Sequence, residues 1–187
     1  MKSDAGSRGF SFIETLAIVG ITLILGAFAI FQLSPALQQE QANSAMNEVA
    51  GELRTARQTA ITERRNIQIQ FLPNNQIQLT RMDLPTGANV LATVTFPGPV
   101  RYALTAGMPD TPDGFGNKSA IVFGGLVGGP PTMLFMSDGT FVNTSGNALN
   151  GTVFLAIPGM NTAARAITVV GATGRIRTYS GQGKAWR

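Results

Sequence analysis

A single apolar segment near the N-terminus constrains the fold of this chain more than any other feature. Between residues 10 and 33, 17 of 24 residues are apolar and Glu14 is the only charged one. A helix of that length spans about 36 Å, whereas the hydrocarbon core of a bilayer is about 30 Å thick. Apolar residues occupy every side of such a helix, which is not typical of a surface helix in a soluble protein. The segment therefore predicts a membrane-spanning helix over residues 10–33.

The charges around this segment predict its orientation. Lys2 and Arg8 precede it, whereas the first basic residue after it is Arg54. The positive-inside rule then places the N-terminus in the cytoplasm and the rest of the chain outside it. A cleaved secretory signal is an alternative, because Ala27-Phe28-Ala29 resembles a small-x-small cleavage site. Glu14 favours a retained helix, since a carboxylate is costly in lipid and neither a signal peptide nor a plain anchor needs one.

Composition excludes several kinds of chemistry. The chain has no Cys and no His, so it has no disulfide, thiolate metal site, imidazole base or His-ligated zinc. No pair of carboxylates is placed as a catalytic pair would be. The three polar residues Asp110, Asp113 and Asn117 fit no standard calcium loop, so we interpret them as turn residues. We therefore predict neither a cofactor nor a metal and no enzymatic activity, an exported enzyme on an anchor being the weakest alternative.

The first residues of the apolar segment carry a motif. The stretch Gly9-Phe10-Ser11-Phe12-Ile13-Glu14 resembles the type IV prepilin signal, a short basic leader ending in Gly, then Phe, then Glu at the fifth position after cleavage. The resemblance implies that a prepilin peptidase cuts between Gly9 and Phe10 and methylates the new amine of Phe10. It also implies that Glu14 pairs with the N-terminal amine of a neighbouring subunit during filament assembly. Phe31 stands where many major pilins carry Pro, which favours a minor pilin or pseudopilin.

The rest of the chain predicts an α+β fold. Three- and four-residue spacing of apolar residues continues the helix amphipathically over residues 34–66, with Arg64, Arg65 and Asn66 at its end. From Ile67 the pattern changes to period two, which is typical of strands. Strands are predicted over residues 67–71, 76–79, 90–96, 100–104, 120–123, 133–136, 140–142, 153–157, 164–170 and 175–179. The predicted organisation is a leader (1–9), a membrane and filament helix (10–33), its continuation (34–66) and a β-rich domain on an antiparallel sheet (67–187).

Positive charge is concentrated at the C-terminus. Residues 139–187 hold five basic and no acidic residues, whereas residues 34–138 hold seven basic and eight acidic ones. On a strand, Arg175 and Arg177 project from one face about 7 Å apart, a spacing that suits two phosphates of a nucleic acid. A flexible tail would add two cations and the ring of Trp186 for base stacking. The predicted DNA-binding residues are Gly174, Arg175, Arg177, Arg165, Lys184 and Arg187.

The C-terminal half also resembles a family. The turn at Asp138-Gly139, the strand over residues 165–169 and the Gly174–Arg177 element look like the C-terminal half of the FimT/GspH group of minor pilins and pseudopilins. The Gly-Arg-x-Arg element is similar to the one that FimT-type minor pilins are thought to use in DNA uptake. The resemblance implies a minor pilin of a type IV pilus that binds double-stranded DNA without sequence specificity in natural transformation.

Two alternatives stay open for the basic C-terminus. The arginines are also what a solvated edge hairpin would carry, or a surface that holds a neighbouring subunit. A GspH-like pseudopilin of a type II secretion system, with a purely structural role, is the alternative function. Either reading places the chain in a bacterial inner membrane as a single-pass protein with a periplasmic domain, and in a pilus or pseudopilus after assembly. The implied partners are the prepilin peptidase, other pilin or pseudopilin subunits and the membrane.

Overall fold

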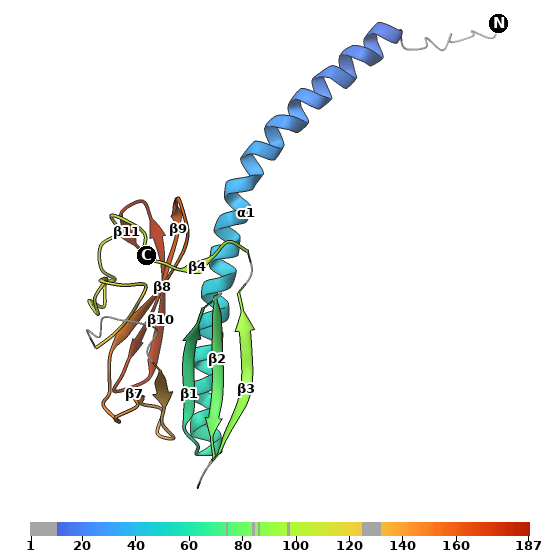
Figure 1. Cartoon of the computed structure of the whole chain (residues 1–187). Helices are drawn as coiled ribbons and strands as arrows, with labels where there is room; N and C mark the ends of the chain where they lie inside the picture. Colours follow the sequence, from blue (N-terminus) through green and yellow to red (C-terminus); the bar gives the residue numbers. More distant parts are fainter. Residues whose placement is uncertain (1–10, 74, 84, 86, 97, 125–131) are drawn as a thin grey trace, which may run out of the picture. The chain divides into compact units, whose positions relative to one another are not determined.

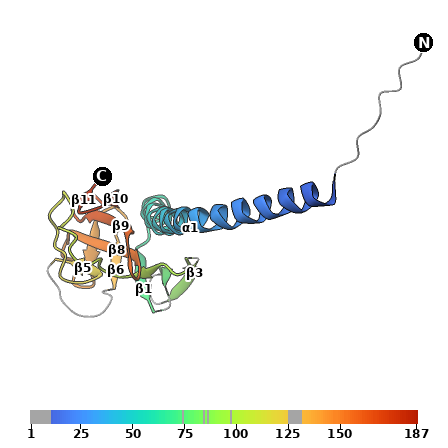
Figure 2. The same cartoon turned by 90° about the horizontal axis from the view of Figure 1, so that it is seen from above.

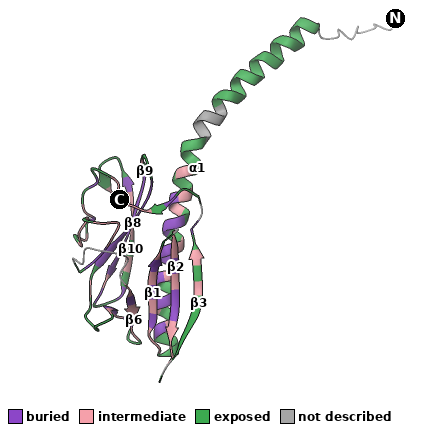
Figure 3. Cartoon of the chain, in the orientation of Figure 1, coloured by how far each residue is buried: buried purple, intermediate pink, exposed green. Residues whose placement is uncertain are grey.

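The computed structural model describes residues 11–187 apart from 74, 84, 86, 97 and 125–131, and only the backbone of residues 29–33. The chain divides into two compact units, Met1–Leu37 and Gln38–Arg187. One helix, α1 (Phe12–Glu63), contributes to both units and continues through Pro35. The Ser11 carbonyl accepts the first helical hydrogen bonds, from the amides of Glu14 and Thr15. Side chains of the first unit are exposed along residues 11–28 (Figure 3).

The predicted membrane span lies in this first unit. Within the part of the chain whose placement is described, no helical stretch has both the length and the apolarity needed to cross a bilayer. The predicted span over residues 10–33 includes Phe10 and the side chains of residues 29–33, which lie outside that part. The membrane span therefore stays a prediction.

In the second unit, α1 presents one apolar stripe to a hydrophobic core. The residues that the three- and four-residue spacing selects are all buried, namely Ala42, Ala45, Met46, Val49, Leu53, Ala56 and Ala60. They belong to one apolar cluster with side chains from both β-sheets. The small alanines allow strand side chains to approach the helix closely, so packing rather than helix propensity holds this half of α1 in place.

The helix ends where the basic residues begin. Glu63 is its last residue, and Arg64 adopts a positive φ of 52°. The Arg65 amide donates to the Ala60 carbonyl at 3.2 Å, which closes the last turn in the manner of a Schellman motif. This reversal sends the chain directly into β1 and lays the first hairpin beside α1 (Figure 1).

Eleven strands follow α1 in the described part of the chain. They are β1 (Ile67–Leu72), β2 (Gln76–Met82), β3 (Ala88–Thr95), β4 (Arg101–Tyr102), β5 (Ile121–Phe123), β6 (Met133–Phe135), β7 (Phe141–Asn143), β8 (Gly151–Ile157), β9 (Met160–Val170), β10 (Arg175–Gln182) and β11 (Ala185–Trp186). One sheet has the order β3-β2-β1-β6-β7, and a second has the order β11-β10-β9-β8-β4, with β5 also paired to β8. The predicted α+β class with antiparallel pairing is confirmed, and the strands form two sheets rather than one (Figures 1 and 2).

The second sheet is covered on both faces around β9. All residues from 163 to 169 are buried, so β9 lacks the alternating exposure of a strand with one wet face. Ala163, Ile167 and Val169 belong to the core that contains α1. On the opposite face, the Thr168 hydroxyl donates to Asp113 in the loop before β5. Because β9 is enclosed, a charged residue on it needs partners inside the fold.

Aromatic side chains fill the space between the sheets. The ring of Phe71 lies 5.9 Å from that of Phe123 and 5.8 Å from that of Tyr102, centroid to centroid. The Tyr102 hydroxyl donates to the Gln76 carbonyl at 2.9 Å, and burial raises the pKa of Tyr102 above its usual value. Contacts between these rings therefore join β1 to β4 and β5, and the one polar group among them, the Tyr102 hydroxyl, is hydrogen-bonded.

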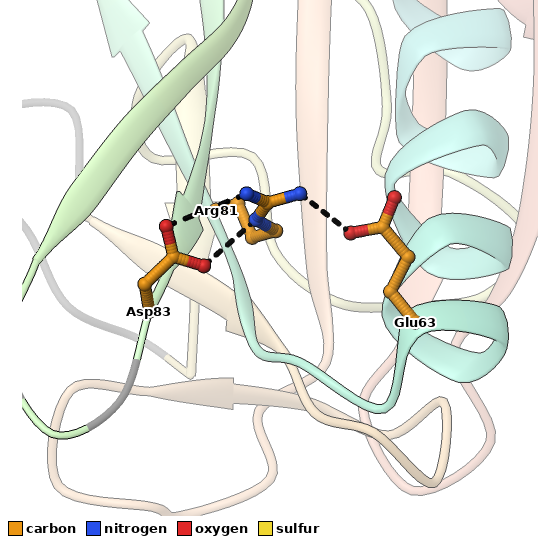
Figure 4. A network of polar contacts seen from close by, with 3 residues as sticks. All are labelled: Glu63, Arg81 and Asp83. Carbon is orange, nitrogen blue, oxygen red and sulfur yellow. Dashed lines mark hydrogen bonds and ion pairs between the residues drawn. The ribbon is translucent and has the colours of Figure 1, made fainter.

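An ion-pair network ties the C-terminal end of α1 to β2. Arg81 on β2 donates from Nη1 to Glu63 at 3.1 Å and from Nε to Asp83 at 2.8 Å (Figure 4). The three side chains are partly exposed, so solvent screens the ion pairs and the network contributes little to the free energy of folding. Two carboxylates neutralise Arg81, so this arginine adds nothing to a basic surface.

Candidate nucleic-acid interface

The processing and assembly residues of the prepilin motif lie in the first unit. Gly9 and Phe10 fall outside the described residues. Glu14 lies in the first turn of α1 with an exposed side chain, and its amide donates to the Ser11 carbonyl at 3.0 Å. No ion pair joins Glu14 to another residue that the structure places. Its predicted pairing with a neighbouring subunit stays a prediction.

The β9–β10 hairpin positions the two central arginines. Arg175 pairs with Val170 and Arg177 with Thr168 in an antiparallel register, so both arginine side chains project from one face of β10. Both residues are exposed, whereas Ile176 between them packs against the core. The spacing expected from the sequence is therefore present in the fold.

Gly174 closes the turn before Arg175. It adopts a φ of +61°, and its amide donates to the Val170 carbonyl at 2.7 Å. A Cβ at this position would lie 2.1 Å from the Gly139 carbonyl oxygen and 2.7 Å from Nε of Arg57. Only glycine satisfies both the left-handed backbone and the close approach, which explains the glycine of the Gly-Arg-x-Arg element in terms of folding.

Arg177 is held by an acidic partner. Its Nη1 lies 2.7 Å from Oδ1 of Asp113, whose other oxygen accepts hydrogen bonds from Tyr179 and Thr168. The side chain of Asp113 is 9% exposed, whereas that of Arg177 is 45% exposed. Partial burial alone would raise the pKa of Asp113, but hydrogen bonds from Thr168 and Tyr179 and the charge of Arg177 lower it. A phosphate at Arg177 would therefore compete with a well-satisfied carboxylate.

The structure corrects the prediction for Arg165, which is buried with only 4% exposed. Its Nε donates to Oδ1 of Asn43 on α1 at 2.8 Å, and its Nη1 donates to the carbonyls of Thr162 and Ala164 at 3.0 and 2.7 Å. Burial lowers the pKa of Arg165, and the charge of nearby Glu40 partly offsets that effect. Arg165 joins β9 to α1, and its guanidinium is not available to DNA in this structure.

The C-terminal tail is folded rather than flexible. Gly181 and Gln182 pair with Trp186 and Ala185, and the Ser180 and Arg187 backbones exchange hydrogen bonds of 2.7 and 2.9 Å. The ring of Trp186 lies 5.9 Å from that of Phe154, and its Nε1 donates to the Pro109 carbonyl at 2.9 Å. The predicted stacking ring is therefore half-buried against the second sheet.

Lys184 and Arg187 are both exposed, at the end of β10 opposite Arg175. The length of β10 puts about 20 Å between that end and the β9–β10 turn. The six predicted DNA-binding residues consequently do not gather into one surface. Gly174, Arg175 and Arg177 lie together, Arg165 is inside the fold, and the two tail cations are remote from the turn.

Two arginines on the polar side of α1 lie beside the turn. Arg54, Arg57, Thr173, Gly174 and Arg175 line a groove of about 840 Å³. Arg57 donates from Nε to the Gly139 carbonyl at 3.3 Å and from Nη2 to the Thr173 carbonyl at 3.1 Å. Arg54 and Arg57 are three residues apart and share a helix face, and only the fold shows that this face meets the hairpin.

Two of the three loop residues interpreted as turn residues, Asp110 and Asn117, make local contacts, whereas Asp113 binds Thr168, Arg177 and Tyr179 across the fold. The Asp110 carboxylate accepts from the amides of Thr111 and Gly116, both at 2.7 Å. Asn117 donates to the Met108 carbonyl at 3.4 Å. Across the described ranges, no three acidic residues cluster as metal ligands would.

Comparison with solved structures identifies the fold. No protein-family model and no curated protein matches the sequence. The minor pseudopilin EpsH from the type 2 secretion system of Vibrio cholerae aligns over 75% of this chain and 97% of its own, with 11% identity and a TM-score of 0.51. Two crystal structures of the type IV minor pilin FimU from Pseudomonas aeruginosa align over 79% and 73% of this chain and 93% and 90% of their own. Their identities are 17% and 18%, with TM-scores of 0.49 and 0.47.

The EpsH alignment shows that this chain has the pilin fold, an N-terminal helix packed on antiparallel β-structure. The pilin-like fold expected from the two sequence motifs agrees with this alignment.

Proposed function

We propose that this chain is a minor subunit of a type IV pilus, processed between Gly9 and Phe10 and assembled through α1. The observation that carries the proposal is the combination of a pilin fold with a prepilin-type N-terminus. An apolar helix whose large side chains are exposed, such as Leu23 and Leu25 at 69% and 63%, needs a partner environment. A membrane before assembly and the helices of neighbouring subunits afterwards supply that environment.

We propose further that the β9–β10 hairpin binds double-stranded DNA through phosphate contacts. Arg175 is exposed, and no ion pair joins it to another residue of the described ranges. Residues 139–187 hold no acidic residue, so no side chain of the hairpin offsets the exposed charge of Arg175, which attracts polyanions. Binding of this kind is independent of sequence and weakens steeply with salt.

A DNA-binding assay on the full chain in detergent tests this second proposal. The Kd for a labelled duplex is measured over a salt series for the wild type, for Arg175→Ala/Arg177→Ala and for Arg101→Ala. The double variant is expected to lose most of the affinity. Arg101 is an exposed arginine on β4 that does not line the groove, so its variant controls for loss of one charge. Absence of wild-type binding at low salt would overturn DNA binding but leave the assembly proposal intact.

Assembly is tested with Glu14. Glu14→Gln should be cleaved at the normal rate yet fail to enter filaments, because a neutral amide does not neutralise the neighbour's amine. Glu40→Gln, an exposed acidic position further along α1, is the matched control and should assemble normally. Normal incorporation of Glu14→Gln would remove the pairing role, and an uncut chain carrying the wild-type sequence would overturn the prepilin proposal.

A GspH-like pseudopilin of a type II secretion system is the second candidate function. The fold similarity to EpsH is the observation that favours it. In that case deletion of the chain should impair protein secretion and leave DNA uptake unchanged. Restoration of each activity by the wild type and by Arg175→Ala/Arg177→Ala separates the two candidates, since only DNA uptake depends on the arginine pair.

A further inference from the structure

We propose that the groove between α1 and the β9–β10 turn, lined by Arg54, Arg57 and Arg175, is a binding site for the phosphodiester groups of a nucleic-acid strand. This inference rests on the proposed DNA binding and assigns it to a different set of residues. The hairpin alone offers Arg175 and an Arg177 that Asp113 already neutralises. The groove adds two cations from the helix.

The charge of this groove is not compensated within the fold. Three arginines line it and no acidic residue does. No ion pair joins Arg54, Arg57 or Arg175 to a carboxylate of the described chain. Arg54 and Arg57 are neighbours on one helix face, where like charges repel and weaken a helix. The hydrogen bonds of Arg57 stabilise the fold, but they leave the charge of the three arginines uncompensated, and a bound polyanion would stabilise all three cations together.

Arg57 is fixed in place before any ligand arrives. Its Nε and Nη2 donate to the Gly139 and Thr173 carbonyls. Gly139 lies in the turn between β6 and β7, and Thr173 lies in the turn between β9 and β10. These two bonds use only one side of the guanidinium fork and leave further N–H groups for a ligand. A pre-oriented fork loses little conformational entropy on binding, which favours an oxyanion ligand.

Two glycines make this arrangement possible. Gly139 and Gly174 have φ values of +84° and +61°, and a Cβ would press on Ile61 at Gly139 and on Arg57 at Gly174. The added Cβ of Gly174 would also strike the Gly139 carbonyl oxygen. The β9–β10 turn therefore packs tightly against α1. Arg175, the next residue, lines the groove.

The shape of the groove favours a nucleic-acid strand over a single carboxylate. One acidic side chain from another subunit would satisfy one guanidinium, whereas three arginines spread over a helix and a strand match successive phosphates. Arg175 is the residue that the groove shares with the hairpin, whereas Arg177 binds Asp113 on the sheet face opposite the core that contains α1. The groove therefore fits phosphodiester groups better than an acidic side chain of a neighbouring subunit. The experiment below also tests for contact with a neighbouring subunit.

The salt dependence of DNA binding tests the groove. The full chain in detergent is titrated into a labelled 30-base-pair duplex between about 50 and 200 mM salt, as wild type, Arg54→Ala, Arg54→Lys and Arg101→Ala. Each lost phosphate contact makes the negative slope of log K against log salt shallower by about 0.9 and weakens binding about five- to tenfold. We expect that loss in Arg54→Ala, recovery in Arg54→Lys and wild-type behaviour in Arg101→Ala. Arg54 is exposed on α1, so its variants should fold, which thermal denaturation checks.

The outcomes separate the groove from the proposed function. If Arg54→Ala binds like the wild type while Arg175→Ala/Arg177→Ala loses affinity, the groove site is wrong and hairpin binding stands. If the wild type does not bind at low salt, both fail. If Arg54→Ala binds DNA normally but enters filaments poorly, the groove contacts a neighbouring subunit and the phosphodiester site is overturned.

Discussion

At the scale of single residues, three arginines of one hairpin occupy three different electrostatic environments. Arg165 is enclosed by carbonyls and the Asn43 amide oxygen, Arg177 faces the Asp113 carboxylate, and Arg175 faces solvent. Their charges are equal, but the free energy of bringing a phosphate to each differs because the existing partners must first be released. Only the last of the three is ready to bind.

The first prediction concerns Arg165. Arg165→Leu removes the donor that satisfies Asn43 and the Thr162 and Ala164 carbonyls, so it should lower the free energy of unfolding by about 2–4 kcal/mol. Arg175→Leu, which removes an exposed arginine of the same hairpin, should change it by about 0.5 kcal/mol or less. Denaturant unfolding of both variants measures the difference. Equal effects would show that the buried contacts of Arg165 do not contribute to stability.

A second prediction concerns Asp113 as a competitor for Arg177. Asp113→Asn keeps the shape of the side chain but removes the negative charge that neutralises Arg177. DNA affinity should therefore rise about threefold or more, with a steeper salt dependence, because one more cation meets phosphate. The same duplex titration measures it. A fall in affinity would indicate that Asp113 orients Arg177 for DNA instead of masking it.

The pH dependence of stability offers a third prediction at the same residue. Because the folded protein lowers the pKa of Asp113, its carboxylate stabilises the fold above the pKa of the unfolded chain, about 3.9. That contribution is lost as pH falls through the lower pKa of the folded state. The Tm of the wild type should exceed that of Asp113→Asn at pH 6, and the gap should narrow toward pH 3. A constant gap would show that hydrogen bonding without charge explains the difference.

Arg165 and Arg177 also show why residue environments were only partly predictable. The alternation of side chains along a strand correctly predicted that Arg175 and Arg177 share one face, because this alternation depends on local geometry alone. Asn43, the partner of Arg165 on α1, lies 122 residues away along the chain, and Asp113, the partner of Arg177, lies 64 residues away. No local pattern contains such contacts, so the sequence could not separate a buried arginine from an exposed one.

At the scale of elements, the β9–β10 turn couples the hairpin to the helix. Three segments distant in sequence meet there, since Arg57 of α1 binds the carbonyls of Gly139 and Thr173. The turn thus serves as the joint between the second sheet and α1, and its glycines set how closely the two approach. A change at the joint should affect stability and DNA binding together.

Gly174→Ala tests this coupling. The new Cβ would meet the Gly139 oxygen and Nε of Arg57, in a backbone conformation that alanine rarely adopts. We expect the free energy of unfolding to fall by about 1–3 kcal/mol and the DNA affinity to fall with it. Gly183→Ala is the control, because Gly183 also has a positive φ but nothing lies near its Cβ. If the two variants have equal effects on DNA affinity, the close approach to Arg57 is not what matters.

Helices and strands with a regular spacing of apolar residues could be predicted from the sequence. The arrangement of the strands in two sheets could not. The spacing of apolar residues on α1 selected the buried stripe, and alternation located the β1–β2 hairpin. The division into two sheets depends on β6 returning to pair with β1, with Ile67 opposite Phe135. That contact spans more than sixty residues, and its partner is chosen by packing of the whole core rather than by any short pattern.

At the scale of the whole molecule, the net charge of +4 is unevenly distributed and unevenly available. Carboxylates neutralise Arg81 and Arg177, the fold encloses Arg165, and Lys184 and Arg187 lie at the far end of β10. What remains near the β9–β10 turn is a group of cations from both the N-terminal helix and the C-terminal hairpin. The basic region that composition assigned to the C-terminus is, in space, a joint surface of the helix and the hairpin.

This distribution predicts the total salt dependence of DNA binding. If Arg54, Arg57 and Arg175 make the phosphate contacts, log K should fall with log salt with a slope of about −2.7, since each contact contributes about −0.9. If instead the five C-terminal cations all contacted phosphate, the slope would be about −4.5. Two duplexes of unrelated sequence should give the same value, because phosphate contacts carry no sequence information. Measuring the slope for the wild type and for Lys184→Ala/Arg187→Ala decides between the two surfaces. If the groove binds DNA, both proteins should give a slope of about −2.7. If the variant's slope is shallower than that of the wild type by about 1.8, the two tail cations contact phosphate and the tail takes part in binding.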